Sequence, residues 1–143
     1  MRLMPENACV LKLFEIYEEK NKLILILELM EGKSLEKFIK TNPNLSENQI
    51  YDIFYQILKS VSFLHSNGIM HRDIKPDNIL FSKEKELYFL KMADFSLADN
   101  FFSLKTFKAI CGTPGFMAPE IFSGNGYDEK VDIYSLGLVL YTL

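Results

Sequence analysis

Residues 71–78 read His71-Arg72-Asp73-Ile74-Lys75-Pro76-Asp77-Asn78, which places a carboxylate, an ammonium and a carboxamide on one short loop. A second carboxylate, Asp94, follows sixteen residues after Asn78, just behind an apolar segment of strand-like composition. Attack by an alcohol on a terminal phosphate needs a group that accepts the hydroxyl proton and aims the oxygen, and a carboxylate can do both. The stretch therefore predicts transfer of a phosphoryl group from a magnesium nucleotide to a hydroxyl.

Each polar side chain of this loop suits one part of that chemistry. Asp73 is the candidate base, Lys75 can neutralise charge that grows on the transferred group, and Asn78 can offer its carbonyl oxygen to magnesium. The alternative interpretation is a solvated polar turn, since Asp, Asn and Pro are ordinary turn residues. Five specified residues in eight positions arise by chance at roughly one start in millions for equal residue usage, which favours a functional loop. Asp94 taken alone would be a turn former, and its pairing with the loop makes it a candidate metal ligand.

The composition is that of one globular domain with no strong charge bias. The 143 residues are 48% hydrophobic and carry a net charge of -3, so no basic excess indicates nucleic acid or an anionic membrane as the main partner. Cys9 and Cys111 form no CxxC pattern, so neither a disulfide framework nor a zinc site is predicted, and an intracellular, cytoplasmic location is expected. No apolar run approaches the roughly 20 residues that span a bilayer. No pattern sets an oligomeric state.

The expected elements are strands first and helices later, which predicts an α+β fold. Two hairpins are expected, one from Val10–Glu18 and Lys22–Leu29, the other from Ile79–Phe81 and Leu87–Met92 with residues 82–86 as its loop. Ser34 can cap a short helix that runs through Lys40, and Ser46 with Gln49 forms a capping box for a longer helix. That longer helix has apolar residues at helical spacing (Ile50, Ile53, Phe54, Ile57, Leu58, Val61, Leu64) until Asn67-Gly68 ends it. The last helical pattern, Lys130–Leu143, is interrupted by the chain end, so we expect an incomplete domain.

Three segments resemble the signature set of the eukaryotic protein kinases in order and spacing. They are residues 71–78, Asp94-Phe95-Ser96, and Gly112-Thr113-Pro114-Gly115-Phe116-Met117-Ala118-Pro119-Glu120. The position of Lys75 and the Gly-Thr-Pro-Gly segment are similar to the serine/threonine branch, and within it to the calcium/calmodulin-dependent-like group. The resemblance implies a partial protein kinase-like fold in a single partial domain, residues 1–143. Residues 1–30 would be a remnant of the strand-rich lobe with the hinge, and residues 31–143 the first half of the helical lobe.

The resemblance also implies ATP and magnesium as cofactors, a protein substrate with serine or threonine, and a role for each matching residue. Asp73 would be the catalytic base, Lys75 the γ-phosphate contact, and Asn78 and Asp94 the magnesium ligands. Backbone groups of Glu28 and Met30 would meet the adenine edge, Leu80 would lie under its ring, and Thr113 would touch the substrate hydroxyl site. Arg72 would pair with a phosphate on the activation segment, His71 and Phe95 would stack in the packing column between the lobes, and Asp132 would anchor the catalytic loop. Glu120 would pair with an arginine that this chain does not contain.

The chain also departs from the family pattern. The glycine-rich loop and the lysine that positions the phosphates precede the region matched here, so we expect the parent domain to be active and the isolated chain to be weak or inactive. Ser96 replaces the glycine of Asp-Phe-Gly, and Ala109 stands where related kinases often carry a phosphorylated threonine, which leaves Ser103 and Thr106 as possible phosphosites. A non-catalytic pseudokinase or truncated scaffold that binds a protein partner is the alternative. A small-molecule phosphotransferase would not explain residues 112–120.

Overall fold

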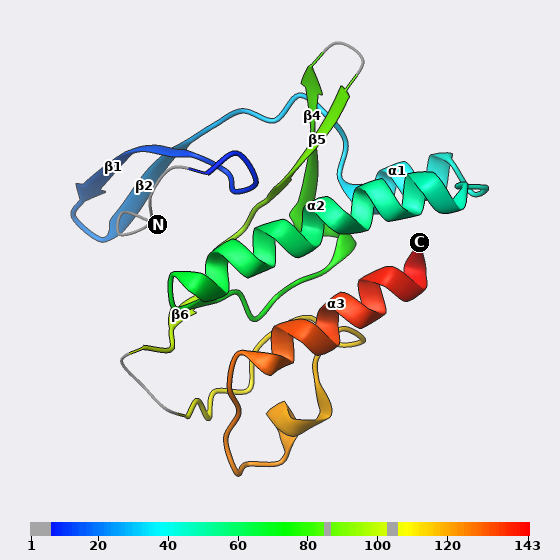
Figure 1. The fold of residues 1–143 in the computed structure, drawn as a ribbon. Coiled ribbons are helices and arrows are strands. Elements are labelled where there is room, and N and C mark those ends of the chain that lie inside the picture. The colour runs from blue at the N-terminus through cyan, green and yellow to red at the C-terminus, as the bar shows by residue number, and fades with distance from the viewer. Residues whose placement is uncertain (1–6, 85–86, 103–105) are drawn as a thin grey trace.

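The computed structural model describes residues 7–84, 87–102 and 106–143 (Figure 1). Its elements are β1 (Leu13–Glu19), β2 (Lys22–Leu27), α1 (Leu35–Thr41), α2 (Glu47–Ser66), β3 (Ile69–Met70), η1 (Pro76–Asn78), β4 (Ile79–Glu84), β5 (Leu87–Met92), β6 (Asp99–Asn100), η2 (Pro119–Phe122) and α3 (Lys130–Thr142). The described strands form three two-stranded antiparallel sheets, β1-β2, β3-β6 and β4-β5. The mixture of strands and helices confirms the α+β class.

The first hairpin is present, but its first strand begins later than the sequence predicts. β1 pairs with β2 from Leu13 to Glu19, whereas the preceding residues leave the hairpin and pair with β5. Leu11 N donates to Met92 O and Met92 N donates to Cys9 O, and each hydrogen bond is 2.9 Å long. This parallel pairing joins the segment before β1 to the strand that leads into Asp94. In Figure 1 the hairpin projects from the rest of the chain.

Both predicted helix starts are confirmed by their caps. The Ser34 hydroxyl accepts the Lys37 N–H at α1, and Ser46 with Gln49 forms the reciprocal capping box at α2. α2 ends at Ser66, and Gly68, two residues later, has a φ of 73° in the left-handed region. Any Cβ at this position would lie 2.4 Å from the Phe102 ring, so glycine is required there for space as well as for conformation.

The second hairpin is longer than the sequence predicts, because β4 continues to Glu84 and the prediction of residues 82–84 as loop was wrong. The two-residue strands β3 and β6 were not predicted at all. They pair Ile69 with Asn100 and Met70 with Asp99. β3 directly precedes the loop of residues 71–78, and β6 follows Asp94, so this small sheet brings the two predicted site segments together.

Two hydrophobic clusters meet at the loop of residues 71–78. The larger cluster joins the inner face of α2 to α1, the β4–β5 hairpin and α3 (Val10, Leu35, Ile53, Ile57, Val61, Leu64, Ile74, Ile79, Phe81, Leu90, Met92, Leu136, Val139). The smaller one gathers Met70, Phe107, Ala118, Ile121, Tyr127 and Val131. Ile74 belongs to the first and Met70 to the second, and both are fully buried. The loop is thus held from both sides.

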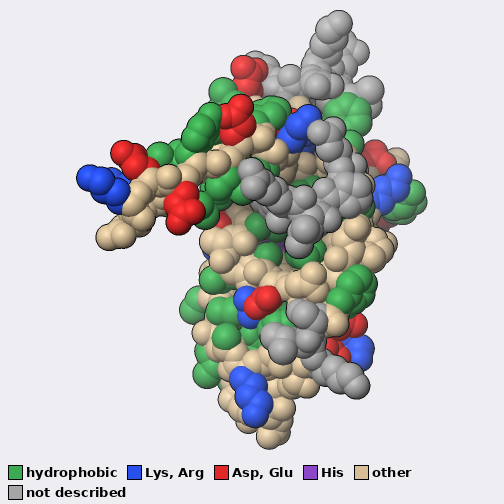
Figure 2. Space-filling view, turned by 90° about the vertical axis from the view of Figure 1, so that its left-hand side faces the viewer, with side chains coloured by type: hydrophobic (Ala, Val, Ile, Leu, Met, Phe, Trp, Pro, Cys, Tyr) green, Lys and Arg blue, Asp and Glu red, His purple; other side chains and the backbone are tan. Residues whose placement is uncertain are grey.

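The first hairpin exposes large apolar side chains beside charged ones. Exposed large side chains include Phe14, Tyr17, Leu23, Ile24, Leu25, Ile26 and Leu27. On the face in Figure 2, Lys and Arg side chains are interspersed with Asp and Glu, and hydrophobic side chains lie between them. None of the helices in the described residues has the length and apolarity needed to span a membrane.

Candidate active site

The loop of residues 71–78 takes its shape from a turn at Arg72. The φ of Arg72 is 66°, which is uncommon for a residue with a side chain and needs support from its surroundings. η1 then starts at Pro76, whose fixed φ suits the first position of a helical turn. Between them Ile74 is fully buried, so the side chains at 73 and 75 are held on either side of an anchored residue.

Asp132, on α3, stabilises this turn through hydrogen bonds to its backbone. Its side chain is 0% exposed and its carboxylate accepts the N–H groups of His71 (2.8 Å) and Arg72 (2.9 Å). A third partner is His65 Nε2, 2.9 Å from Oδ2. A buried carboxylate costs several kcal/mol unless it is hydrogen-bonded. The expected donors around Asp132 are therefore present. Through them the Asp132 carboxylate holds two successive residues of the loop.

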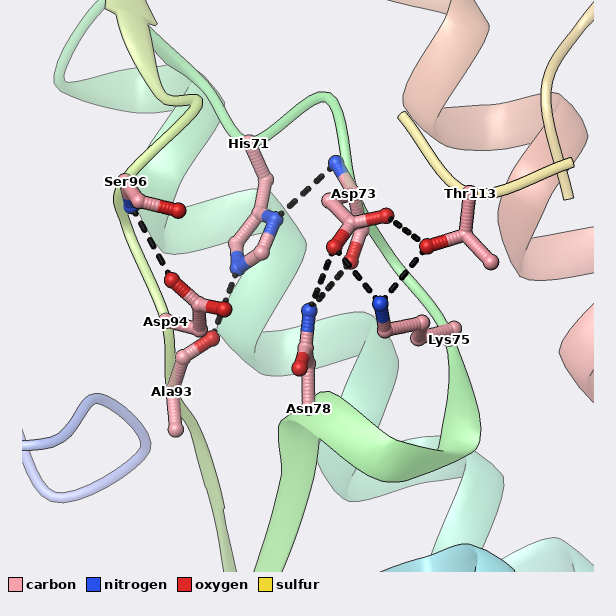
Figure 3. Close-up of polar contacts among 8 residues, drawn as sticks. All are labelled: His71, Asp73, Lys75, Asn78, Ala93, Asp94, Ser96 and Thr113. Atoms are coloured by element: carbon pink, nitrogen blue, oxygen red, sulfur yellow. Dashed lines mark hydrogen bonds and ion pairs between the residues drawn. The ribbon is translucent and has the colours of Figure 1, made fainter. Parts of the chain in front are cut away.

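Asp73 is surrounded by hydrogen-bond donors (Figure 3). Its Oδ1 accepts the Thr113 hydroxyl at 2.6 Å, while its Oδ2 accepts the Asn78 amide at 2.9 Å and lies 2.9 Å from Lys75 Nζ. Lys75 Nζ also donates to the Thr113 hydroxyl oxygen at 2.6 Å. Burial raises the pKa of Asp73, but the hydrogen bonds from Thr113 and Lys75, the Lys75 charge and the Asn78 amide outweigh it and hold the pKa below the usual value. The Asp73 carboxylate is thus ionised at neutral pH, and these hydrogen bonds fix its orientation.

His71 is a neutral packing residue. It is completely buried, and burial lowers the pKa of its imidazole against the opposing influence of Asp132, the Ala93 carbonyl, Asp73 and Asp94. Nδ1 accepts the Asp73 N–H at 3.2 Å, which leaves the proton on Nε2 to donate to Ala93 O at 3.0 Å. Its ring centre lies 5.0 Å from that of Phe95. The ring links the loop to the strand that carries Asp94.

Asp94 reaches the loop through backbone pairing. Ala93 N donates to Asn78 O at 2.9 Å, and the φ of 58° at Asp94 turns the chain there. One carboxylate oxygen accepts the Ser96 N–H at 3.2 Å. Ser96 itself is not among the residues with positive φ, so serine is tolerated here without backbone strain. The Asp94 carboxylate is thus held by a backbone group of Ser96, which any residue at position 96 except proline could supply.

The donor set fits a magnesium ion. The side-chain NH2 of Asn78 donates to the backbone oxygen and to Oδ2 of Asp73, each at 2.9 Å. The side-chain carbonyl oxygen of Asn78 is therefore left for another partner. Together with the Asp94 carboxylate it would offer two oxygen ligands from protein, a number typical of magnesium, which takes its other ligands from water and phosphate. Within the described residues no three His, Cys, Asp or Glu side chains form a metal-binding group.

Of the predicted adenine contacts Glu28, Met30 and Leu80, Glu28 forms an ion pair that the sequence did not predict. Lys91 Nζ contacts both carboxylate oxygens of Glu28, at 2.6 and 2.8 Å, and Lys91 stands opposite Leu80 in the β4–β5 hairpin. The Glu28 N–H donates to Lys12 O, and Met30 is half-buried. Partial burial raises the pKa of Glu28, but the hydrogen bonds from Lys91 and the Lys12 N–H hold it below the usual value.

Arg72 has an acidic partner that was not predicted. Its Nε donates to Leu97 O at 2.6 Å and its Nη2 to Asp99 Oδ2 at 3.1 Å. Of the predicted phosphosites, Thr106 is exposed and Ser103 lies outside the described residues. Glu120 is half-buried at the start of η2 and has no ion-pair partner among the residues that the structure describes.

Comparison with known proteins places the chain among enzymes of known kind. The model of the protein kinase domain family matches residues 2–143. Calcium/calmodulin-dependent protein kinase type IV of Mus musculus is 41% identical over 143 residues, which is all of this chain and 30% of that protein. A probable myosin light chain kinase of Dictyostelium discoideum is 39% identical over 134 residues, 94% of this chain and 38% of that protein. The serine/threonine-protein kinase cds1 of Schizosaccharomyces pombe is 38% identical over 141 residues, 94% of this chain and 30% of that protein.

The chain thus spans about a third of the length of these relatives. The match covers the loop of residues 71–78, Asp94 and residues 112–120 alike. The geometry around Asp73 and the similarity along the chain lead to one conclusion: the chain belongs to the protein kinase domain family.

Proposed function

We propose that the protein containing this chain is a serine/threonine protein kinase that transfers the γ-phosphoryl group of ATP to hydroxyl groups of a protein substrate. The observation that carries the proposal is the position of the Thr113 hydroxyl. It donates to Asp73 and accepts from Lys75, and each hydrogen bond is 2.6 Å long. An alcohol oxygen can therefore be held by a carboxylate and an ammonium at once, which is the arrangement that phosphoryl transfer to an alcohol requires. The printed names of the relatives support the serine/threonine type.

In the proposed reaction the substrate hydroxyl donates to Asp73 in the way that Thr113 does. Its oxygen bonds to the γ-phosphorus as the bond from that phosphorus to the β,γ-bridging oxygen breaks, and ADP leaves with the electron pair. The hydroxyl proton passes to Asp73, whose low pKa makes it an orienting group first and a proton acceptor late in the step. Lys75, within reach of the same oxygen, balances charge on the transferred group.

Asn78 and Asp94 would hold magnesium, which supplies positive charge to the phosphate oxygens when bound. Their own contribution is orientation, since Asn78 is fixed by Asp73 and Asp94 by the Ser96 N–H. On the nucleotide side, backbone groups of Glu28 and Met30 and the side chain of Leu80 would receive the adenine. We also propose an intracellular, cytoplasmic location, which is supported by the free thiols of Cys9 and Cys111.

The test uses the full-length protein in a radiolabelled ATP assay with a peptide substrate. Asp73→Asn should lower kcat about 10²- to 10⁴-fold, the range for loss of a positioned acid–base group, while MgATP binding is kept. Asp94→Asn should weaken binding of the nucleotide in the presence of magnesium and leave binding in EDTA unchanged. Asp52→Asn, an exposed change of the same kind on α2, is the matched control. Unchanged kcat in Asp73→Asn, with the control also unchanged, would overturn the proposal.

A further inference from the structure

The guanidinium of Arg72 is enclosed on three sides by the protein itself. Nε donates to Leu97 O at 2.6 Å, Nη2 donates to Asp99 Oδ2 at 3.1 Å, and the group lies over the Phe107 ring, 5.4 Å from its centre. The Arg72 side chain is 10% exposed. An arginine that binds an external anion would have its Nε and Nη2 donors unoccupied. In Arg72 both of these groups donate to protein oxygens, and Asp99 pairs with its charge.

Two of these partners, Asp99 and Phe107, also lie in backbone pairings of their own. Asp99 lies in β6, where it pairs with Met70 of β3, and the next residue but one, Phe101, donates its N–H to Gly68 O at 2.8 Å. Phe107 exchanges two backbone hydrogen bonds with Tyr127, at 3.0 and 2.9 Å. The cradle around Arg72 is therefore part of two separate pieces of folded backbone.

The side chain of Arg72 donates to Leu97 O and Asp99, and no hydrogen bond joins it to a hydroxyl group of the described residues between Asp94 and Glu120. Ala109 has none, and its carbonyl accepts the Tyr127 hydroxyl at 2.5 Å. Thr106 packs its methyl group against Gly126, where a Cβ would come within 2.0 Å of Thr106 Cγ2. Thr113 is engaged by Asp73 and Lys75. A phosphate carried to Arg72 would in addition meet the carboxylate of Asp99, which repels it.

We propose that Asp99 is the resident anion of Arg72, so that residues 97–102 and 106–113 are positioned for phosphoryl transfer without phosphorylation of that segment. This inference rests on the proposed kinase function. Asp99 is a positioning residue: it acts on Arg72, whose backbone precedes the candidate base Asp73 and shares the Asp132 carboxylate with His71. Loss of its charge frees the guanidinium and loosens the link between the catalytic loop and the segment that carries Thr113.

The first experiment measures kinetics of the full-length protein before and after complete treatment with a broad-specificity phosphatase, checked by mass spectrometry. Treated wild type should keep its kcat within about twofold of the untreated protein. Asp99→Asn should lower kcat about 10- to 100-fold, the scale of a misplaced catalytic group, with the KM for ATP nearly unchanged, and Asp99→Glu should recover at least a third of the lost rate. A loss of more than tenfold in treated wild type, or a kcat for Asp99→Asn within twofold of wild type, would overturn the proposal.

The second experiment does not depend on activity. Amide hydrogen exchange is compared at residues 97–101 in phosphatase-treated wild type, Asp99→Asn and Asp128→Asn. Asp128 is a matched control because its side chain is 44% exposed, against 43% for Asp99, and it pairs with a lysine away from the site. Faster exchange in Asp99→Asn alone supports the ion pair as the device that holds the segment, and equal exchange in all three overturns it. If wild type transfers no phosphoryl group at all, the proposed function fails, while this measurement still decides the role of Asp99.

Discussion

Removal of the Asp132 carboxylate should destabilise the chain more than any exposed acidic change. Asp132→Ala leaves the N–H groups of His71 and Arg72 without their acceptor in a buried place. Each unsatisfied group costs about 1–3 kcal/mol, so the loss is about 4 kcal/mol, a large fraction of the roughly 5–15 kcal/mol that a domain has. Asp132→Asn keeps one acceptor oxygen and should lose about half as much, about 2 kcal/mol.

Urea unfolding followed by circular dichroism measures this loss. With a slope of about 2 kcal/mol/M, a loss of about 4 kcal/mol moves the midpoint by roughly 2 M. The control is Asp52→Asn, which should stay within about 0.5 kcal/mol of wild type because Asp52 is exposed. A midpoint for Asp132→Ala that coincides with that of Asp52→Asn would refute the reasoning that these two N–H groups depend on one carboxylate.

Two further predictions concern His71 and the Lys91–Glu28 pair. The folded state keeps His71 neutral, while the unfolded chain protonates it below the usual pKa of 6.5; stability should therefore fall as the pH drops below 6.5, by up to about 1.4 kcal/mol per pH unit. Thermal melts between pH 7 and 5 check this, and an equal slope in His71→Gln would contradict it. Because Lys91 and Glu28 are mutual partners, Lys91→Met and Glu28→Gln should each cost about 1–2 kcal/mol, and the double variant should cost little more than either. Full additivity in that double-mutant cycle would show that the two side chains are not coupled.

The predictable parts of this chain are those encoded by local pattern. The capping box at Ser46 and the apolar spacing to Leu64 specify α2, since both depend on neighbours within a few positions. By contrast, β3 and β6 have two residues each and show no period that a sequence could reveal. The start of β1 was misplaced because residues 9–11 pair with a strand about 80 positions later.

In the candidate site, too, residues close together in the sequence were predicted and contacts between distant positions were not. Asp73, Lys75 and Asn78 are close in sequence and were found together as a motif, and Asp132 was found through the family resemblance. Asp99 and Lys91 were missed because their partners lie 27 and 63 positions away along the chain. An ion pair at that separation has no local pattern, and only the folded chain brings its members together.

The loop of residues 71–78 lies between two hydrophobic clusters: Met70, which precedes it, belongs to one, and Ile74, inside it, belongs to the other. Packed side chains transmit small displacements because they leave little free volume. A small molecule or protein that wedges either cluster apart would therefore shift the carboxylate at position 73 from a distance. If the proposed kinase function holds, a compound that binds at either cluster would inhibit it without competing with the nucleotide.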